Sequence, residues 1–190
     1  MILKGYDEYT KDIELYSYDE LSDNSELKKQ YLSWLNDMDV VRPILSPELM
    51  LAKDMKFIEK SFERFTQKNA KGFFIKYIPE NMFVGTIKLD KMNSVNNSTE
   101  IGIMIGEKTL WSRGIGQIAY KILLKYVFEV LKLNRVWGGT DEHNTSMQKI
   151  FLNTGFMQEG RFRESNFFEG KYSDNFYYSI LKEDYYEKNR

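Results

Sequence analysis

The stretch EIGIMIGEKTLWSRGIGQIAYKILLKYV, Glu100 to Val127, decides the fold of this 190-residue chain. It begins with alternating isoleucines that predict a half-buried strand, crosses a short polar loop and enters a long apolar helix. Between them, Gly114 and Gly116 let the backbone approach a ligand closely, because glycine has no Cβ. The first N–H groups of the following helix are free, so the turn predicts a phosphate site.

Other glycine-rich phosphate loops do not fit this turn. A Walker loop is excluded because no Gly-Lys-Ser/Thr follows, and the dinucleotide fingerprint is excluded because its third glycine is missing. A lone Gly-x-Gly also occurs as a plain strand-to-helix turn, so the motif by itself does not establish a ligand.

Composition limits the class of protein. Lys and Arg (27) nearly balance Asp and Glu (28), so no charge excess draws the chain to nucleic acid or to an anionic membrane. The lack of cysteine excludes disulfides, thiolate metal sites and cysteine nucleophiles, and the single histidine excludes a multi-histidine metal centre within one chain. No apolar run resembles a signal peptide or approaches about 18 residues, so we expect a cytoplasmic protein without a membrane span.

Hydrophobic periodicity predicts strands and helices arranged around one core. Strands are expected at 12–19, 72–78, 81–92, 99–105, 134–141, 156–165 and 175–182, helices at 24–38, 47–66, 115–132 and 144–155, and a loop at 40–47. Three adjacent strands imply an antiparallel meander, and the later strand–helix–strand unit implies a parallel pair. The sequence therefore predicts a single α/β domain over residues 1–190, with a mixed sheet and helices on both faces.

The order of these elements, together with WSRGIGQIA, resembles the GCN5-related N-acetyltransferase (GNAT) family, in its ribosomal-protein and sugar N-acetyltransferase branch. The family's Gln/Arg-x-x-Gly-x-Gly/Ala loop corresponds to Trp111 through Gly116, with tryptophan in place of the usual first residue. The segments YLSWLNDMDVVRPI, NRVWGGTDEHNTSMQKIFLNTGF and RFRESNFFEGKYSDNFYYSILKEDY match the same branch, so the likeness covers nearly the whole chain. It implies a GNAT fold with a splayed central pair of parallel strands, a closing hairpin and acetyl-CoA as cosubstrate.

The resemblance also implies which residues hold acetyl-CoA. The backbone of the loop would bind the pyrophosphate, the end of the preceding strand would pair with the pantetheine arm, and the first residue of the later helix would contact that arm. These cofactor-binding residues are Met104, Ile105, Trp111, Ser112, Arg113, Gly114, Ile115, Gly116 and Asn144. Asn144 equally suits a simple helix N-cap.

Glu100 is the candidate catalytic residue. By alternation it shares a strand face with Gly102 and Met104, and the family often places its general base here, to take a proton from the attacking ammonium directly or through water. A solvated or salt-bridged strand glutamate is the competing interpretation. His143 is a second candidate, although a lone histidine at a helix start is more often a surface or capping residue.

One position departs from the family pattern. Many members carry a tyrosine in the last helix that protonates the leaving thiolate, and Phe151 stands at that position here. An ordinary thiol has a pKa of about 8.5, so CoA can leave as a thiolate without much help. The departure keeps open the alternative that the chain is a non-catalytic CoA-binding protein.

The expected acceptor is a primary amine that attacks the thioester directly. The first two helices and the closing hairpin supply aromatic and charged side chains, a mixture that suits a nucleotide-linked aminosugar. These residues are Trp34, Asn36, Asp37, Asp39, Arg42, Arg161, Arg163, Glu164, Phe167, Phe168, Lys171 and Tyr172. A protein amino terminus is the main alternative acceptor, and aminoglycosides or a polyamine are less favoured. We expect a small-molecule amine as partner, no nucleic acid or membrane, and a monomer or homodimer.

Overall fold

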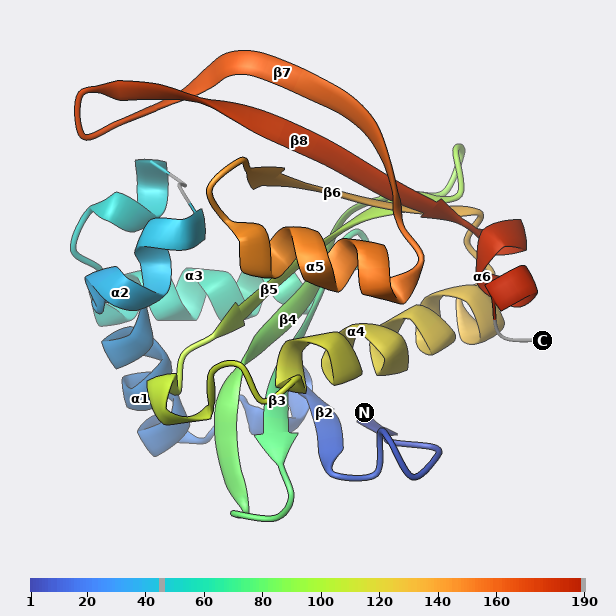
Figure 1. Cartoon of the computed structure of the whole chain (residues 1–190). Helices are drawn as coiled ribbons and strands as arrows, with labels where there is room; N and C mark the ends of the chain where they lie inside the picture. The colour runs from blue at the N-terminus through green and yellow to red at the C-terminus, as the bar shows by residue number, and fades with distance from the viewer. Residues whose placement is uncertain (45–46, 189–190) are drawn as a thin grey trace.

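The computed structural model describes residues 1–44 and 47–188 and arranges the strands in one sheet (Figure 1). Within these residues, eight strands lie in the order β1-β2-β3-β4-β5-β6-β8-β7. The strands are β1 Ile2–Lys4, β2 Ile13–Ser17, β3 Lys71–Tyr77, β4 Met82–Asn93, β5 Ser98–Ile105, β6 Arg135–Asp141, β7 Met157–Phe168 and β8 Lys171–Leu181.

Helices cover both faces of the sheet. The α-helices are α1 Ser25–Leu35, α2 Met38–Val41 and α3 Met55–Phe65 on one face, α4 Ile115–Lys125 and α5 Thr145–Thr154 on the other, and α6 Lys182–Lys188 after β8 (Figure 1). Short 3-10 turns are η1 Tyr18–Leu21, η2 Arg42–Ile44, η3 Pro47–Met50 and η4 Lys108–Leu110, and α4 runs on into a π-helical turn, Tyr126–Val130. In the part of the chain that the structure describes, no helix is long and apolar enough to span a membrane.

The central strands are buried on both faces because their side chains alternate between two apolar clusters. In β5, Ile101 packs in the cluster that contains Leu123 of α4 and Phe151 of α5, whereas Met104 packs in the cluster that contains Tyr31 of α1. Full burial of a leucine side chain contributes roughly 1.5–3 kcal/mol. Packing of this kind fixes α4 against the sheet and so fixes the loop that leads into it.

β5 and β6 separate after a short parallel contact. Ser98 to Glu100 pair with Arg135 to Trp137, and among the described residues no further pair joins the two strands. β5 continues beside β4 as far as Ile105, and β6 continues beside β8 as far as Asp141. Two facing strand edges are therefore open in the middle of the sheet, where backbone groups are normally paired.

Local capping signals set several helix boundaries. The Asn24 side chain caps α1 by accepting from the Leu27 amide at 3.0 Å, a common role of asparagine at a helix start. The Asp54 side chain caps α3 by accepting from the Phe57 amide at 3.0 Å. Gly155 closes α5 with a left-handed φ of 100°, which glycine adopts without strain.

The predicted meander, parallel pair and closing hairpin are confirmed, and the differences lie mainly in the N-terminal third. Residues 47–66 are not one helix: a 3-10 turn comes first, and α3 begins only after the Asp54 cap. The predicted loop at 40–47 includes the end of α2 and the turn η2, while residues 45–46 lie outside the described residues. Periodicity predicts neither β1 nor α6, because these elements are too short to show a repeating pattern.

Gly138 of β6 has no room for a side chain. A Cβ there would lie 2.8 Å from the Phe151 ring and 3.0 Å from the carbonyl oxygen of Ile101. We expect Gly138→Ala to lower the free energy of unfolding by about 1–3 kcal/mol through overpacking, measured by urea denaturation. The matched change Gly102→Ala meets no atom within 4 Å and should be neutral or stabilising. Equal destabilisation by both changes would contradict the packing argument.

Candidate active site

A cleft of about 520 Å³ opens where β5 and β6 separate. The end of β5, the loop before α4, the first turn of α4 and the start of α5 form its walls. Its lining includes Ile103, Met104, Ile105, Trp111, Ser112, Gly114, Ile115, Gly116 and Asn144. All the cofactor-binding residues predicted from the sequence therefore line one cleft, with the exception of Arg113.

The loop between β5 and α4 is built to expose its backbone. Ser112 has a φ of 63° and Gly114 a φ of 78°, both in the left-handed region. The indole Nε1 of Trp111 donates to the carbonyl oxygen of Ile105 at 2.9 Å, which holds the loop against the end of β5. Because no side chain caps the start of α4 among the described residues, its first N–H groups are free to bind an anion.

The two loop glycines are required for different reasons. A Cβ on Gly114 would meet open space, so its glycine is favoured by the left-handed backbone rather than by crowding. A Cβ on Gly116 would lie 3.0 Å from Cδ1 of Ile150 and 3.6 Å from Cδ1 of Ile103. Because it lacks a side chain, Gly116 therefore leaves space at the bottom of the cleft, where α4 and α5 meet.

Arg113 does not line the cleft. Its guanidinium lies 3.5 Å from the Glu80 carboxylate, and both side chains are about half exposed. An ion pair of this length at the surface contributes little stability, so it does not lock the side chain in place. Whether Arg113 contributes charge to a bound phosphate stays a prediction.

Asn144 is a helix cap and also a link between two parts of the site. Its side-chain oxygen accepts from the Met147 amide at 3.1 Å, which confirms the N-cap interpretation. Its side-chain amide donates to the carbonyl oxygen of Pro43 in η2 at 2.9 Å. Asn144 and Pro43 line the cleft and also a second cavity beyond it.

The second cavity, of about 390 Å³, lies between η2, the end of β6 and the tip of the β7–β8 hairpin. The hairpin arches over towards α2, and Arg42 of η2 pairs with Glu169 at its tip at 3.0 Å (Figure 1). The other lining residues are Pro43, Asp141, His143, Asn144, Phe168, Lys171, Tyr172 and Ser173. The cavity thus combines aromatic, basic and acidic groups from segments far apart in the sequence.

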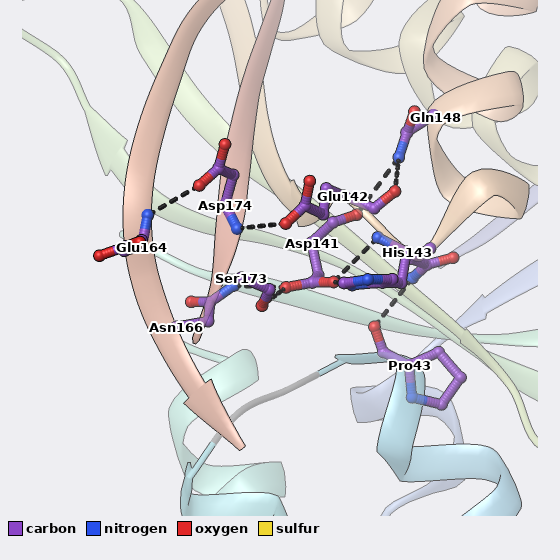
Figure 2. A network of polar contacts seen from close by, with 10 residues as sticks. Pro43, Asp141, Glu142, His143, Gln148, Glu164, Asn166, Ser173 and Asp174 are labelled. Carbon is purple, nitrogen blue, oxygen red and sulfur yellow. Dashed lines mark hydrogen bonds and ion pairs between the residues drawn. The ribbon is translucent and has the colours of Figure 1, made fainter. Parts of the chain in front are cut away.

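A polar network centred on Asp141 supports this cavity (Figure 2). The buried carboxylate accepts from Asn166 at 2.8 Å, from the His143 amide at 2.9 Å and from the Ser173 hydroxyl. Burial alone would raise the pKa of Asp141, but these hydrogen bonds outweigh it and lower the pKa. Asp141 therefore stays a carboxylate and ties the end of β6 to the hairpin.

His143 is held by the same carboxylate but stays open to solvent. Its Nδ1 lies 2.9 Å from Oδ1 of Asp141, and its side chain is 78% exposed. The sequence interpretation of a surface residue at a helix start is therefore correct, and the residue also lines the second cavity.

Glu100 stands at the last paired position before the strands part, opposite Trp137. Its carboxylate pairs with the ammonium of Lys91 at 2.7 Å and is partly exposed. The Lys91 ammonium also lies 5.2 Å above the Trp137 ring. Glu100 lines neither cavity. Its link to the site is its position where β5 and β6 begin to separate.

Sequence reasoning did not identify Lys91, Trp137 or Tyr177 as parts of this region. Trp137 stacks on Tyr177 with ring centres 6.2 Å apart. Lys91 reaches Glu100 only because β4 and β5 pair with Asp90 opposite Glu100. The strand register supplies that information, and a single sequence fixes it poorly.

The comparison with known proteins identifies the family. The acetyltransferase (GNAT) domain model matches residues 22–157, most of the chain. The chain belongs to the GNAT acetyltransferase family. Its membership supports an acyltransferase that uses acetyl-CoA as the acyl donor, as the sequence resemblance implies.

The names of relatives of this GNAT protein give different acceptors or none. "Putative ribosomal N-acetyltransferase YdaF" of Bacillus subtilis is 35% identical over 101 residues, which cover 53% of this chain and 55% of that protein. Spermidine N(1)-acetyltransferase of Vibrio cholerae is 23% identical over 132 residues, 70% of this chain and 76% of that protein. Acetyltransferase PseH of Campylobacter jejuni is 25% identical over 144 residues, 76% and 84% respectively. The match spans about half the length of the Bacillus protein, and no single acceptor follows from the set.

Solved structures share the fold. Spermidine N-acetyltransferase from Vibrio cholerae, in complex with CoA and spermine, superposes with a TM-score of 0.80 at 17% identity, covering 92% of this chain and 98% of that one. A GNAT-family acetyltransferase from Bacillus anthracis superposes with a TM-score of 0.75 at 22% identity, covering 96% and 99%. These comparisons confirm the predicted GNAT fold.

Phe151 of this GNAT protein is part of the core. It is 1% exposed and stacks on Tyr178 with ring centres 4.9 Å apart. Its neighbour Tyr120 has a fully buried hydroxyl without a hydrogen-bond partner among the described residues, and burial raises the pKa of that phenol well above its usual value. Neither residue lines a cavity, so neither stands out as a proton donor to a leaving thiolate.

A side chain added at Gly116 would fill the bottom of the cleft. We expect Gly116→Val to weaken acetyl-CoA binding at least tenfold, because a branched side chain would stand where α4 and the ligand must approach closely. Isothermal titration calorimetry would measure the affinity, and a thermal melt would show whether the variant is folded. Gly160→Val is the control for changing a glycine elsewhere, because a Cβ there would make only ordinary contacts, the nearest at 3.8 Å. Normal affinity in a folded Gly116→Val variant would contradict the assignment of this cleft to the donor.

Proposed function

We propose that residues 1–190 act as a single acetyltransferase domain that moves an acetyl group from acetyl-CoA to a primary amine of a small molecule, such as a nucleotide-linked aminosugar. The observation that carries this proposal is the junction of two cavities beside the open edges of β5 and β6. Asn144 and Pro43 line both cavities. A donor in the larger one and the body of an acceptor in the smaller one would be neighbours there, while the acceptor's amine would reach between the open strand edges to Glu100.

On the donor side, we propose that the backbone from Ser112 to Gly116 binds the pyrophosphate of acetyl-CoA. The free N–H groups at the start of α4 and the left-handed loop backbone support this assignment. Met104 and Ile105, on the open edge of β5, would pair with the amides of the pantetheine arm. Asn144 would contact the same arm, and Arg113 would add its charge after leaving Glu80.

The proposed transfer is direct. The amine loses a proton, its nitrogen forms a bond to the thioester carbon, and the C–S bond breaks as CoA leaves as a thiolate. Glu100 takes the ammonium proton, directly or through water, and solvent protonates the thiolate in the absence of a tyrosine at Phe151. A backbone amide on the open edge of β5 would polarise the thioester carbonyl.

The second cavity suggests what the rest of the acceptor carries. Phe168 and Tyr172 provide aromatic surfaces, and Lys171 and Arg42 provide cations that suit a diphosphate. The cavity also holds the carboxylates of Asp141 and Glu169, so a polyamine is a competing occupant that the amine panel tests. This lining supports a nucleotide-linked aminosugar as the acceptor class.

A protein amino terminus is a second candidate acceptor, supported by the 35% identity to the protein named as a ribosomal N-acetyltransferase. A non-catalytic CoA-binding protein is a third, supported by the phenylalanine at position 151. The three functions differ in what a turnover assay would show.

The proposed function is tested by release of free thiol from acetyl-CoA with a panel of amines. We expect turnover with a UDP-linked aminosugar such as UDP-glucosamine at a kcat/KM at least tenfold above that for spermidine or for a peptide with a free amino terminus. A higher value for the peptide would instead identify the protein substrate. Acetyl-CoA binding without turnover on any amine would favour the non-catalytic alternative.

Glu100→Gln tests the proton acceptor. We expect the rate to fall more than tenfold near neutral pH while acetyl-CoA affinity stays similar, because glutamine cannot take the proton. Glu14→Gln is the matched control, since Glu14 is also a strand glutamate paired with a lysine, Lys4, at 3.5 Å. An unchanged rate in Glu100→Gln would exclude Glu100 as the base.

A further inference from the structure

Lys91 occupies an unusual position at the end of β4. It has a left-handed φ of 49°, at an irregularity in the β4–β5 pairing between Asp90 and Asn93. A non-glycine residue in this conformation is uncommon and is held by its surroundings. Here the backbone directs the side chain to the apex where β5 and β6 part.

Two groups contact the Lys91 ammonium there. Its Nζ lies 2.7 Å from Oε2 of Glu100 and 5.2 Å from the centre of the Trp137 ring. A carboxylate together with an aromatic face is a recognised arrangement for binding an organic cation. The hydrogen bond to Glu100 is the main cause that raises the pKa of Lys91, so the side chain stays protonated.

The aromatic wall extends beyond Trp137. Tyr177 stacks on Trp137 with ring planes 20° apart, and Phe162 of the neighbouring strand lies 4.4 Å from Tyr177 between ring centres. Gly102 and Gly139 are both exposed, one on each side of the opening, and a Cβ on Gly102 would meet open space. A Cβ on Gly139 would lie 3.5 Å from the Asn175 side-chain amide and 3.6 Å from the Tyr177 ring, so the surface beside the ammonium is open at Gly102 and bordered by an amide and an aromatic ring at Gly139.

We propose that Glu100, Trp137 and Tyr177 form the subsite that binds the ammonium of the acceptor, and that Lys91 is its resident occupant in the absence of acceptor. The incoming ammonium displaces the Lys91 ammonium, lies between the Glu100 carboxylate and the Trp137 ring, and gives its proton to Glu100. This inference rests on the proposed function and names where the acceptor's reacting end binds.

The arrangement of charges allows the exchange. The Lys91 side chain is 61% exposed, so water can receive its ammonium when it leaves Glu100. Asp90, the nearest other acid on β4, is engaged by Arg64 of α3 at 2.7 Å and does not compete for the acceptor. Since one cation replaces another, the exchange leaves no carboxylate unpaired.

When the Lys91 ammonium occupies the subsite, the apparent affinity of the subsite for another ammonium is lower. The apparent dissociation constant equals the intrinsic constant divided by the fraction of molecules whose subsite is free. If Lys91 occupies the subsite for most of the time, its removal should tighten binding of a simple ammonium at least about fivefold. A surface ion pair with no binding role would produce no such gain.

The experiment is a titration of n-butylammonium followed by two-dimensional NMR of the backbone amides of Gly102 and Gly139. In Lys91→Gln we expect the dissociation constant to fall at least fivefold relative to the parent protein. Adding Trp137→Leu to Lys91→Gln should raise it again at least threefold. n-Butanol, which has the same hydrocarbon chain without the charge, should show no difference between the proteins.

Lys76→Gln is the matched control variant. The Lys76 ammonium also lies over aromatic rings, those of Tyr16 and Phe83, at 5.6 Å and 5.8 Å, but at the opposite end of β4. It should leave n-butylammonium binding unchanged. A change of less than twofold in Lys91→Gln, or an equal gain in Lys76→Gln, would overturn the proposal.

A kinetic measurement separates this inference from the proposed function. With an amine that the parent protein acetylates, Lys91→Gln should lower KM at least threefold with little change in kcat. If no amine in the panel is acetylated, the proposed function fails, but the titration still decides whether the ammonium subsite exists. If turnover occurs and KM does not fall, the subsite proposal is wrong while the acetyltransferase function stands.

Discussion

The short pairing of β5 with β6 is the constraint on which the rest of the site depends. Three residues on each strand pair in parallel, and then each strand follows its other neighbour away. α4 packs against β5, and β8 of the long hairpin pairs with β6. These contacts keep the two halves of the sheet apart beyond the short parallel contact. The result is a pair of open strand edges inside a folded core, which only a ligand or water can satisfy.

The loop before α4 lies beside this opening because it starts at the end of β5. The Trp111 indole is hydrogen-bonded to the carbonyl of Ile105, so the loop cannot swing away from the strand. The left-handed backbone at Ser112 and Gly114 turns the chain so that α4 begins at the cleft. A helix start with free N–H groups and an open strand edge are thus held side by side by one buried strand and the tryptophan that follows it.

On the far side of the opening, contacts between distant segments shape the second cavity, the proposed acceptor region. Asp141 ties β6 to the hairpin, and Arg42 meets Glu169 at the hairpin tip. Surface ion pairs such as Arg42–Glu169 are individually weak, so this wall of the second cavity can adjust to an acceptor. The buried carboxylate of Asp141 is better shielded from solvent and gives the part of the hairpin next to its tip a fixed position.

Much of the fold was readable from the sequence because its signals are local. Alternating isoleucines in β5, the glycines of the loop and the caps at Asn24 and Gly155 each act within a few residues. The helix predicted over 47–66 was wrong for a related reason: apolar spacing continues across the break, and the Asp54 cap decides where the helix restarts.

The sequence by itself determined the order of the central strands and helices, the glycine-containing loop before α4 and the family, and hence the chemistry to expect. Only the tertiary structure decided that Lys91 faces Glu100, that Trp137 lies beneath that ammonium, and that Arg113 turns to Glu80. It alone brought η2 and the hairpin tip together around a second cavity. The physical reason is that these contacts depend on strand register and on packing between segments far apart in the chain, which no local pattern encodes.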